Sequence, residues 1–196
     1  CLQSDLIMRI ISGKFKNKKI LLPSDKLTRP LKDIVRESIF NVIEHSNLIE
    51  NEMLNSSILD LYSGSGSFGL ECLSRGASRV DFCENYPPAF EILKKNLNHL
   101  NCANHADIYN DNVFNFIKNL KKNNIKYDFI FMDPPYKENK ITELLDMIFK
   151  KEIFTKKGLF ILHRNKKTID NLPKNFKIFL DKTYGLSKIY FGKFNA

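Results

Sequence analysis

The chain has 196 residues, of which 43% are hydrophobic, and this fits one globular domain with a small appendage. No apolar run is long enough to span a membrane, and the residues before Met8 lack the basic start and apolar core of a signal peptide. Four scattered cysteines exclude paired zinc ligands and predict reduced thiols in a cytoplasmic protein, with Cys72 and Cys83 in the core.

The formal net charge of +9 is unevenly distributed. Residues 1–40 hold 9 basic and 4 acidic residues, residues 41–149 hold 10 and 15, and residues 150–196 hold 12 and 3. Basic ends around an acidic middle favour a polyanionic partner such as RNA. The alternative is that some lysines are only solvated surface.

The chain before residue 57 predicts a hairpin and a helix. Residues 9–23 have two apolar stretches around a turn-prone segment, as in a β-hairpin that docks on the main domain or on RNA. Its lysines and Phe15 suit contacts with phosphates and a base, although an ordinary charged hairpin has the same composition. Residues 31–45 carry apolar residues at helical spacing.

From Ser57 onward, apolar strands alternate with helical segments. We expect strands at residues 58–62, 79–83, 106–109, 127–132 and 158–162, with helices at 68–75, 87–100, 112–120 and 141–149. Residues 176–180 and 187–191 predict a closing antiparallel pair. The chain is therefore predicted to be α/β, with a mostly parallel, Rossmann-like sheet of seven strands, helices on both faces and an N-terminal β-hairpin.

A glycine-rich turn, Gly64-Ser65-Gly66-Ser67-Phe68-Gly69, follows the first of these strands and opens a helix. Glu84 ends the next strand, where a carboxylate can accept hydrogen bonds from a ribose. This spacing fits both NAD and S-adenosylmethionine. Asp60, just before the turn, favours S-adenosylmethionine, because a carboxylate repels a pyrophosphate and attracts a sulfonium or an ammonium group.

The segment Asp133-Pro134-Pro135-Tyr136 follows another buried strand. The Asp133 carboxylate and the Pro134 carbonyl can both accept hydrogen bonds from an exocyclic amine, and Tyr136 offers a face for stacking. Two acceptors in one plane turn the lone pair of the amine nitrogen outward, which suits methyl transfer to a nucleobase. A strand followed by a tight turn is the alternative interpretation.

These motifs resemble the RsmD-type family of bacterial 16S rRNA guanine-N2 methyltransferases. The resemblance covers residues 8–15, Arg29-Pro30, residues 33–41, and residues 59–71 with 73–77 and the Asp-Pro-Pro-Tyr segment, and it runs from about Met8 to the C-terminus. It implies a class I methyltransferase domain at residues 29–196 behind an RNA-contacting tail and hairpin at residues 1–28. The chain departs from the family pattern at Leu31-Lys32, at Tyr86 and at Leu162-His163-Arg164.

The resemblance and the motifs together give candidate site residues. For catalysis they are Asp133, Pro134, Pro135 and Tyr136. For S-adenosylmethionine they are Asp60, Tyr62, Ser63, Gly64, Ser65, Gly66, Phe68, Gly69, Glu84, Asn85, Asn112 and Asp133. For RNA they are Arg9, Lys14, Lys16, Lys18, Lys19, Arg29 and Arg36. We expect no metal. His163 ends a strand, and we expect it to be a structural or solvent-facing residue, with a position facing the site as the alternative.

The expected partner is small-subunit rRNA, in an assembling or assembled 30S particle, bound by a monomeric protein. Three alternatives stay open on the sequence alone. They are an adenine-N6 methyltransferase acting on DNA or RNA, an NAD-dependent enzyme, and a non-catalytic RNA-binding assembly factor.

Overall fold

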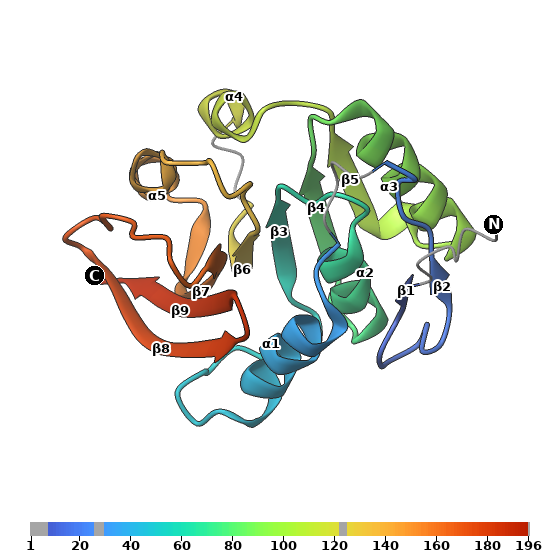
Figure 1. Cartoon of the computed structure of the whole chain (residues 1–196), viewed down its shortest axis with the longest axis horizontal. Coiled ribbons are helices and arrows are strands. Elements are labelled where there is room, and N and C mark those ends of the chain that lie inside the picture. The colour runs from blue at the N-terminus through green and yellow to red at the C-terminus, as the bar shows by residue number, and fades with distance from the viewer. Residues whose placement is uncertain (1–7, 26–29, 122–124, 196) are drawn as a thin grey trace.

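A computed structural model of the chain describes residues 8–25, 30–121 and 125–195 (Figure 1). A seven-stranded sheet has the spatial order β5-β4-β3-β6-β7-β9-β8. The strands are β3 (Ser57–Leu61), β4 (Arg79–Cys83), β5 (Ala106–Tyr109), β6 (Tyr127–Met132), β7 (Phe154–Asn165), β8 (Phe176–Tyr184) and β9 (Ser187–Phe194). Strands β3 to β7 pair in parallel, whereas β9 pairs antiparallel with β7 and β8. The predicted fold class is confirmed.

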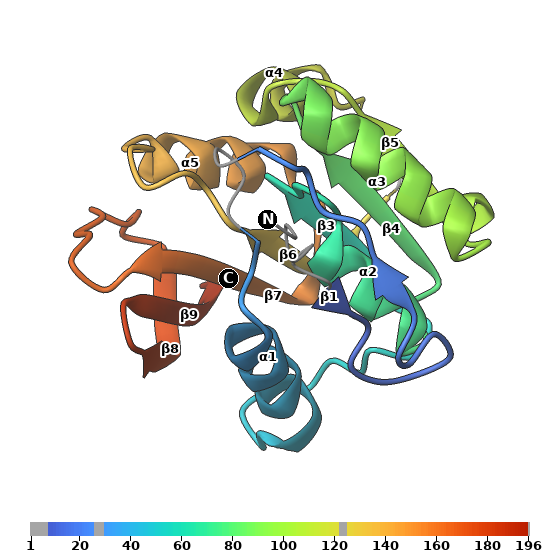
Figure 2. The same ribbon diagram turned by 45° about the vertical axis from the view of Figure 1, so that its right-hand side comes forward.

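Helices cover both faces of this sheet. Strand residues alternate between two cores, since successive side chains of a strand point to opposite faces. Ile58 packs in a core with α1 (Asp33–His45), α2 (Ser67–Ser74) and α3 (Pro87–His99), whereas Leu59 packs in a core with α4 (Val113–Asn119) and α5 (Ile141–Lys151). A 3-10 turn, η1 (Ala103–His105), precedes β5. Figures 1 and 2 show α4 and α5 together on one side of the sheet, apart from α1 and α2.

The strand order reverses beside β3, which places the site. The chain moves outward from β3 through β4 to β5 and then crosses to β6 on the other side of β3. In such sheets a ligand binds at the carboxyl ends of the strands beside this reversal. Here those ends are followed by Tyr62 and Asp133, so the two predicted motifs meet at one edge.

Strand β7 is longer at both ends than the predicted residues 158–162. The apolar pattern does not predict the first residues of β7, because Lys156 and Lys157 are exposed there. A register shift also interrupts the pairing of this part of β7 with β6. At its other end, His163, Arg164 and Asn165 pair with β9. The extension brings His163 next to the carboxyl end of β6.

The N-terminal hairpin is docked on the main sheet domain. Its strands β1 (Met8–Arg9) and β2 (Lys19–Ile20) have two residues each, and Met8, Ile10 and Ile20 belong to the core of α1, α2 and α3. Asn96 of α3 fixes the segment after β2: its Oδ1 accepts from the Leu21 amide at 2.8 Å, and its Nδ2 donates to the carbonyls of Leu21 and Ser65. A short hairpin is thus stabilised by tertiary contacts.

The described part of the chain contains no helix that is long and apolar enough to cross a membrane. Cys72, Cys83 and Cys102 are buried free thiols, as predicted for the first two. Burial raises the pKa of the Cys83 thiol to about 12 and that of Cys102 to about 11, so neither is an activated nucleophile.

Candidate active site

A cavity of about 440 Å³ opens at the carboxyl ends of β3, β4 and β6. This volume is in the range of small-molecule sites. Eleven of the predicted catalytic and cofactor residues line it: Tyr62, Ser63, Gly64, Ser65, Phe68, Glu84, Asn85, Asp133, Pro134, Pro135 and Tyr136. The glycine-rich turn and the Asp133 segment therefore form walls of the same cavity.

Glu84 ties the turn after β3 to the end of β4. Its carboxylate accepts from the Gly64 amide at 2.7 Å through Oε2 and from the Tyr86 amide at 2.7 Å through Oε1. Each carboxylate oxygen has a further lone pair, so Glu84 can still accept hydrogen bonds from ligand hydroxyls. Gly64 has φ +56°, and the position of its missing Cβ has no atom within 4 Å. A side chain at residue 64 would enter open space at the cavity.

Gly66 and Gly69 do not line the cavity, although we predicted cofactor contacts for both. A Cβ on Gly66 would lie 2.5 Å from Leu93 Cδ1, and a Cβ on Gly69 would lie 2.3 Å from Phe82 Cε1. These glycines let α2 approach β4 and α3 closely. They shape the turn from beneath and leave the contact surface to Gly64 and its neighbours.

Asp60 is fully buried and also lies outside the lining of the cavity. Its Oδ2 accepts from the Gly69 amide at 3.0 Å, whereas Oδ1 has no partner among the described residues. Burial raises the pKa of the Asp60 carboxyl well above its usual value, the Gly69 hydrogen bond opposes this, and the negative charges of Asp133 and Glu84 add to it. A cation bound nearby would relieve this repulsion.

These features fit S-adenosylmethionine. The cavity has room beside Gly64, acceptors on Glu84 for ribose hydroxyls, and three carboxylates whose mutual repulsion a sulfonium and an ammonium group would reduce. Asn112, predicted near the adenine, lies elsewhere. Its Oδ1 caps α4 by accepting from the Phe114 amide at 2.9 Å, and it borders a separate hollow beside Lys140.

The loop after β6, residues 133–140, is held in a defined shape. The Asp133 amide donates to the Leu61 carbonyl at 3.4 Å, and the Glu138 amide donates to the Pro135 carbonyl at 2.9 Å. Asp133 Oδ1 lies 2.8 Å from His163 Nδ1. Tyr136 is 44% exposed while it lines the cavity, so its ring is accessible for stacking on a base.

Six lining residues were missed by the sequence prediction: Pro30, Leu31, Ser67, Tyr86, Ala89 and Phe131. Leu31 and Tyr86 are positions where the chain departs from the family pattern. This departure is the sequence feature that could have marked them as residues of the site. Phe131 precedes Asp133 by two residues on the same face of β6, and its ring stacks on Phe68 with 4.0 Å between the centroids. The floor of the cavity is therefore aromatic.

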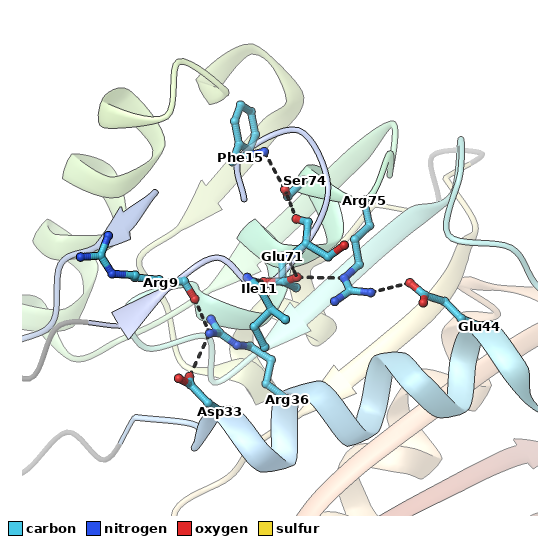
Figure 3. A network of polar contacts seen from close by, with 10 residues as sticks. Arg9, Ile11, Phe15, Asp33, Arg36, Glu44, Glu71, Ser74 and Arg75 are labelled. Carbon is cyan, nitrogen blue, oxygen red and sulfur yellow. Dashed lines mark hydrogen bonds and ion pairs between the residues drawn. The ribbon is translucent and has the colours of Figure 1, made fainter. Parts of the chain in front are cut away.

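The position of Arg36 corrects a prediction. We predicted that it contacts RNA, but it is fully buried, and its Nη2 donates to the Arg9 carbonyl and, at 2.9 Å, to Asp33 (Figure 3). Desolvation lowers the pKa of this guanidinium. From this position Arg36 joins α1 to the hairpin and does not face a partner.

The other predicted RNA contacts on described residues are exposed. Arg9, Lys14, Lys16, Lys18 and Lys19 all lie on the surface of the hairpin. The Arg9 guanidinium donates to the Asn17 carbonyl at 2.9 Å. Arg29, which was also predicted to contact RNA, lies outside the described residues.

Comparison with known proteins agrees with this geometry. A family model described as "Conserved hypothetical protein 95" matches residues 8–193. "Putative rRNA methyltransferase YlbH" of Bacillus subtilis is 32% identical over 93% of this chain and 96% of its own length. "Ribosomal RNA small subunit methyltransferase D" of Buchnera aphidicola from Baizongia pistaciae is 34% identical over 94% of this chain and 89% of its own.

A solved structure, "Putative methyltransferase yhhF from Escherichia coli", superposes with a TM-score of 0.81 at 25% identity, over 96% of this chain and 98% of its own. The similarity spans the hairpin, the glycine-rich turn and the Asp133 loop, since the family model runs from β1 to β9. Family membership decides against the NAD alternative. The chain belongs to the Conserved hypothetical protein 95 family, that of the RsmD-type methyltransferases, whose methyl donor is S-adenosylmethionine.

Proposed function

We propose that this protein transfers a methyl group from S-adenosylmethionine to the exocyclic N2 amine of a guanine in small-subunit rRNA. The observation that carries the proposal is that Asp133, Pro134 and Tyr136 line the same cavity as Gly64 and Glu84. An amine gripped by the first set lies beside a ligand held by the second. The relatives named as small-subunit rRNA methyltransferases support the choice of rRNA.

The residues divide the work of binding and orientation. S-adenosylmethionine supplies an electrophilic methyl group on a positively charged sulfur. Glu84 binds ribose hydroxyls, and the carboxylate of Asp60, beneath the turn, favours the positive end of the ligand. Asp133 Oδ2 and the Pro134 carbonyl accept the two amine hydrogens and aim the nitrogen lone pair. Alignment of the reacting atoms at about 3–3.5 Å supplies most of the rate.

The positive charge that develops on the amine nitrogen during methyl transfer explains why residue 133 is an acid. The amine nitrogen becomes positive as it gains the methyl group, and the Asp133 carboxylate stabilises this charge. The bond from the methyl carbon to sulfur breaks as the bond to nitrogen forms, and the sulfur leaves as a neutral thioether. The nitrogen then loses its proton to solvent water, so Asp133 does not have to be a strong base. Tyr136 stacks on the guanine, which must leave any base pair at a cost of a few kcal/mol.

The exposed lysines of the hairpin supply the RNA contacts in this proposal. Lys14, Lys16, Lys18 and Lys19 lie on one short surface element, whereas the sheet region that surrounds the cavity is acidic. Because these lysines do not line the cavity, they can bind the RNA backbone and leave the cavity to one base. We place the reaction on a 30S particle or its precursor in the cytoplasm.

The second candidate is an adenine-N6 methyltransferase, because an adenine amine fits the same pair of acceptors. Purified protein is incubated with methyl-labelled S-adenosylmethionine and equal amounts of naked rRNA, 30S particles or DNA, and the products are digested to nucleosides. The proposal predicts label in N2-methylguanosine from rRNA or 30S. Label in N6-methyladenosine would support the second candidate, and RNA binding without transfer would support an assembly factor.

A further inference from the structure

His163 lies beside the residue that grips the amine. The parallel register of β6 and β7 pairs Met132 with Leu162, so the next residues, Asp133 and His163, are neighbours at the carboxyl edge of the sheet. His163 Nδ1 lies 2.8 Å from Asp133 Oδ1, and the exposed fractions of the two side chains are 3% and 20%. A buried ring thus contacts a carboxylate that reaches the cavity.

The chemistry of the pair assigns the hydrogen. An ionised carboxylate only accepts hydrogen bonds, so the hydrogen of this contact is assigned to His163 Nδ1, which is the donor. The bond occupies Asp133 Oδ1 and leaves Oδ2 for a substrate amine. Because the imidazole is buried in the sheet, it holds the carboxylate in one rotation about its terminal torsion, which is otherwise broad.

The surroundings of His163 speak against a merely structural role. His163 Nε2 is buried without a hydrogen-bond partner among the described residues, and this costs stability. Leu159 and Ile161, the preceding residues on the same face of β7, are fully buried core residues. A leucine at residue 163 would continue that face with no unpaired nitrogen, so the contact with Asp133 is what the histidine adds.

Arg164, the next residue, holds the same loop from the opposite face of the sheet. Its Nη2 donates to the Glu138 carbonyl at 2.7 Å and its Nη1 to the Pro135 carbonyl at 3.3 Å. Asp170 balances its charge in a bidentate pair at 2.8 and 2.9 Å. Within the described residues no hydrogen bond ends on the Pro134 carbonyl, so this acceptor is left for the amine.

We infer that His163 is a positioning residue for methyl transfer: it fixes the Asp133 carboxylate, while Arg164 fixes the backbone of the loop that carries it. This inference rests on the proposed function, in which Asp133 accepts the amine hydrogen. It requires that loss of the His163 hydrogen bond slows the chemical step and leaves the binding of both substrates nearly unchanged.

Three substitutions of His163 separate the effect of losing the hydrogen bond from the effects of changing the size and polarity of the side chain. The amide nitrogen of His163→Asn can take the place of Nδ1, whereas the amide of His163→Gln lies near the place of Nε2. His163→Leu has no donor. We expect kcat to fall by about 10- to 100-fold in the Leu and Gln variants and by less than about threefold in the Asn variant. KM for RNA and the Kd of S-adenosylmethionine should stay within about threefold in all three.

Thermal unfolding supplies the independent readout. The Leu variant should be at least as stable as the wild-type protein, because it loses a buried unpaired nitrogen. Equal kcat in all four proteins would overturn the inference. So would a Leu variant that loses stability and activity together while the Asn and Gln variants have the same kcat. If the Leu variant does not fold, the Asn and Gln variants decide.

The proposed substrate is judged separately, on the wild-type protein. Absence of methyl transfer to rRNA and to 30S particles by the wild-type protein would count against the proposed function. The His163 variants are then compared on whichever nucleic acid the wild-type protein does label. The ratio of their kcat values to the wild-type kcat tests the positioning role on any amine substrate.

Discussion

Three carboxylates gather at the candidate site, and each is held by different partners. Glu84 accepts two backbone amides, Asp133 contacts His163, and Asp60 accepts one amide while its second oxygen is buried without a partner among the described residues. Glu84 and Asp133 line the cavity, whereas Asp60 lies beneath it. In the proposed function, Glu84 and Asp133 therefore contact the ligands, whereas Asp60 acts through its charge.

Asp60 should make the stability of the ligand-free protein depend on pH. Because its pKa is raised in the folded chain, its contribution to stability is fully present below its unfolded value of about 4 and is lost as the pH rises through the folded pKa. Asp60→Asn keeps an acceptor for the Gly69 amide and does not ionise. The variant should therefore gain free energy of unfolding relative to the wild-type protein as the pH rises.

Urea unfolding of both proteins at a series of pH values between about 4.5 and 8 measures this difference. Parallel curves for the two proteins would show that Asp60 does not carry the pH dependence. The control is Asp107→Asn, since Asp107 is an exposed carboxylate whose side chain is 53% exposed.

Gly64 should be required for ligand binding because of the space beside it. Gly64→Val places a side chain into the cavity and should weaken S-adenosylmethionine binding at least about tenfold, which is about 1.4 kcal/mol or more. Gly185→Val is the matched control, because Gly185 has φ +58° and equally open surroundings but lies in the turn between β8 and β9. Calorimetry checks both. Equal affinity of the two variants would remove Gly64 from the binding surface.

At the scale of elements, a polar network joins the hairpin, α2 and α1. Glu71 of α2 is fully buried and accepts from the amides of Ile11 and Ser12 at 2.8 and 2.9 Å and from Arg75 Nε at 2.9 Å (Figure 3). Arg75 also pairs with Glu44 of α1, and its guanidinium lies over the Phe40 ring. One carboxylate thus fixes the hairpin against the main sheet domain.

Glu71→Ala should destabilise the protein strongly, by about 3–5 kcal/mol, because it leaves the Nε of Arg75 and two backbone amides without their buried acceptor. Glu50→Ala is the control, since Glu50 pairs with Lys157 at an exposed position and its loss should reduce the stability far less. Denaturant unfolding measures both. Similar losses in the two variants would mean that the network is not what holds the hairpin.

The hairpin should act as an RNA clamp through its exposed lysines. Replacing Lys14, Lys16, Lys18 and Lys19 by alanine should weaken RNA binding. The salt slope of binding should fall by roughly 0.7–0.9 for each phosphate that no longer meets a lysine. Binding of S-adenosylmethionine should not change. Titration of RNA at several salt concentrations measures the slope.

A matched quadruple variant in the basic C-terminal segment replaces four exposed lysines by alanine: Lys166, Lys167, Lys174 and Lys182. The clamp predicts a larger change of slope for the hairpin variant. An unchanged slope in the hairpin variant together with a reduced slope in the C-terminal variant would move RNA binding to β8, β9 and the loop before them.

At the scale of the whole molecule, alternating apolar segments were enough to predict the sheet, its class and most helix bounds. Strand order and register were not predictable from local pattern. The carboxyl end of β7 shows why: it is extended by pairing with β9, and the parallel register of β7 with β6 makes His163 a neighbour of Asp133. The expectation of a structural or solvent-facing His163 was made without that neighbour.

The site residues also divide into those that local sequence predicts and those that only the tertiary structure reveals. Residues within the two motifs, such as Gly64 and Asp133, were predicted because the chemistry of the motif is local. Leu31, just before α1, and Ala89, in α3, also line the cavity. Their place in the site follows only from the packing of these helices on the sheet. Arg36 was misjudged for the same reason, since its burial depends on the docked hairpin.

The central claim is that Asp133 directs a methyl group to N2 of a guanine in small-subunit rRNA. The most direct measurement is mass spectrometry of nucleosides from the small-subunit rRNA of cells that lack the gene, complemented with the wild-type gene or with Asp133→Ala. The account predicts that one N2-methylguanosine is lost without the gene, returns with the wild-type gene, and is not restored to the wild-type content by the variant. An unchanged N2-methylguanosine content in the cells without the gene, or full restoration by Asp133→Ala, would contradict it.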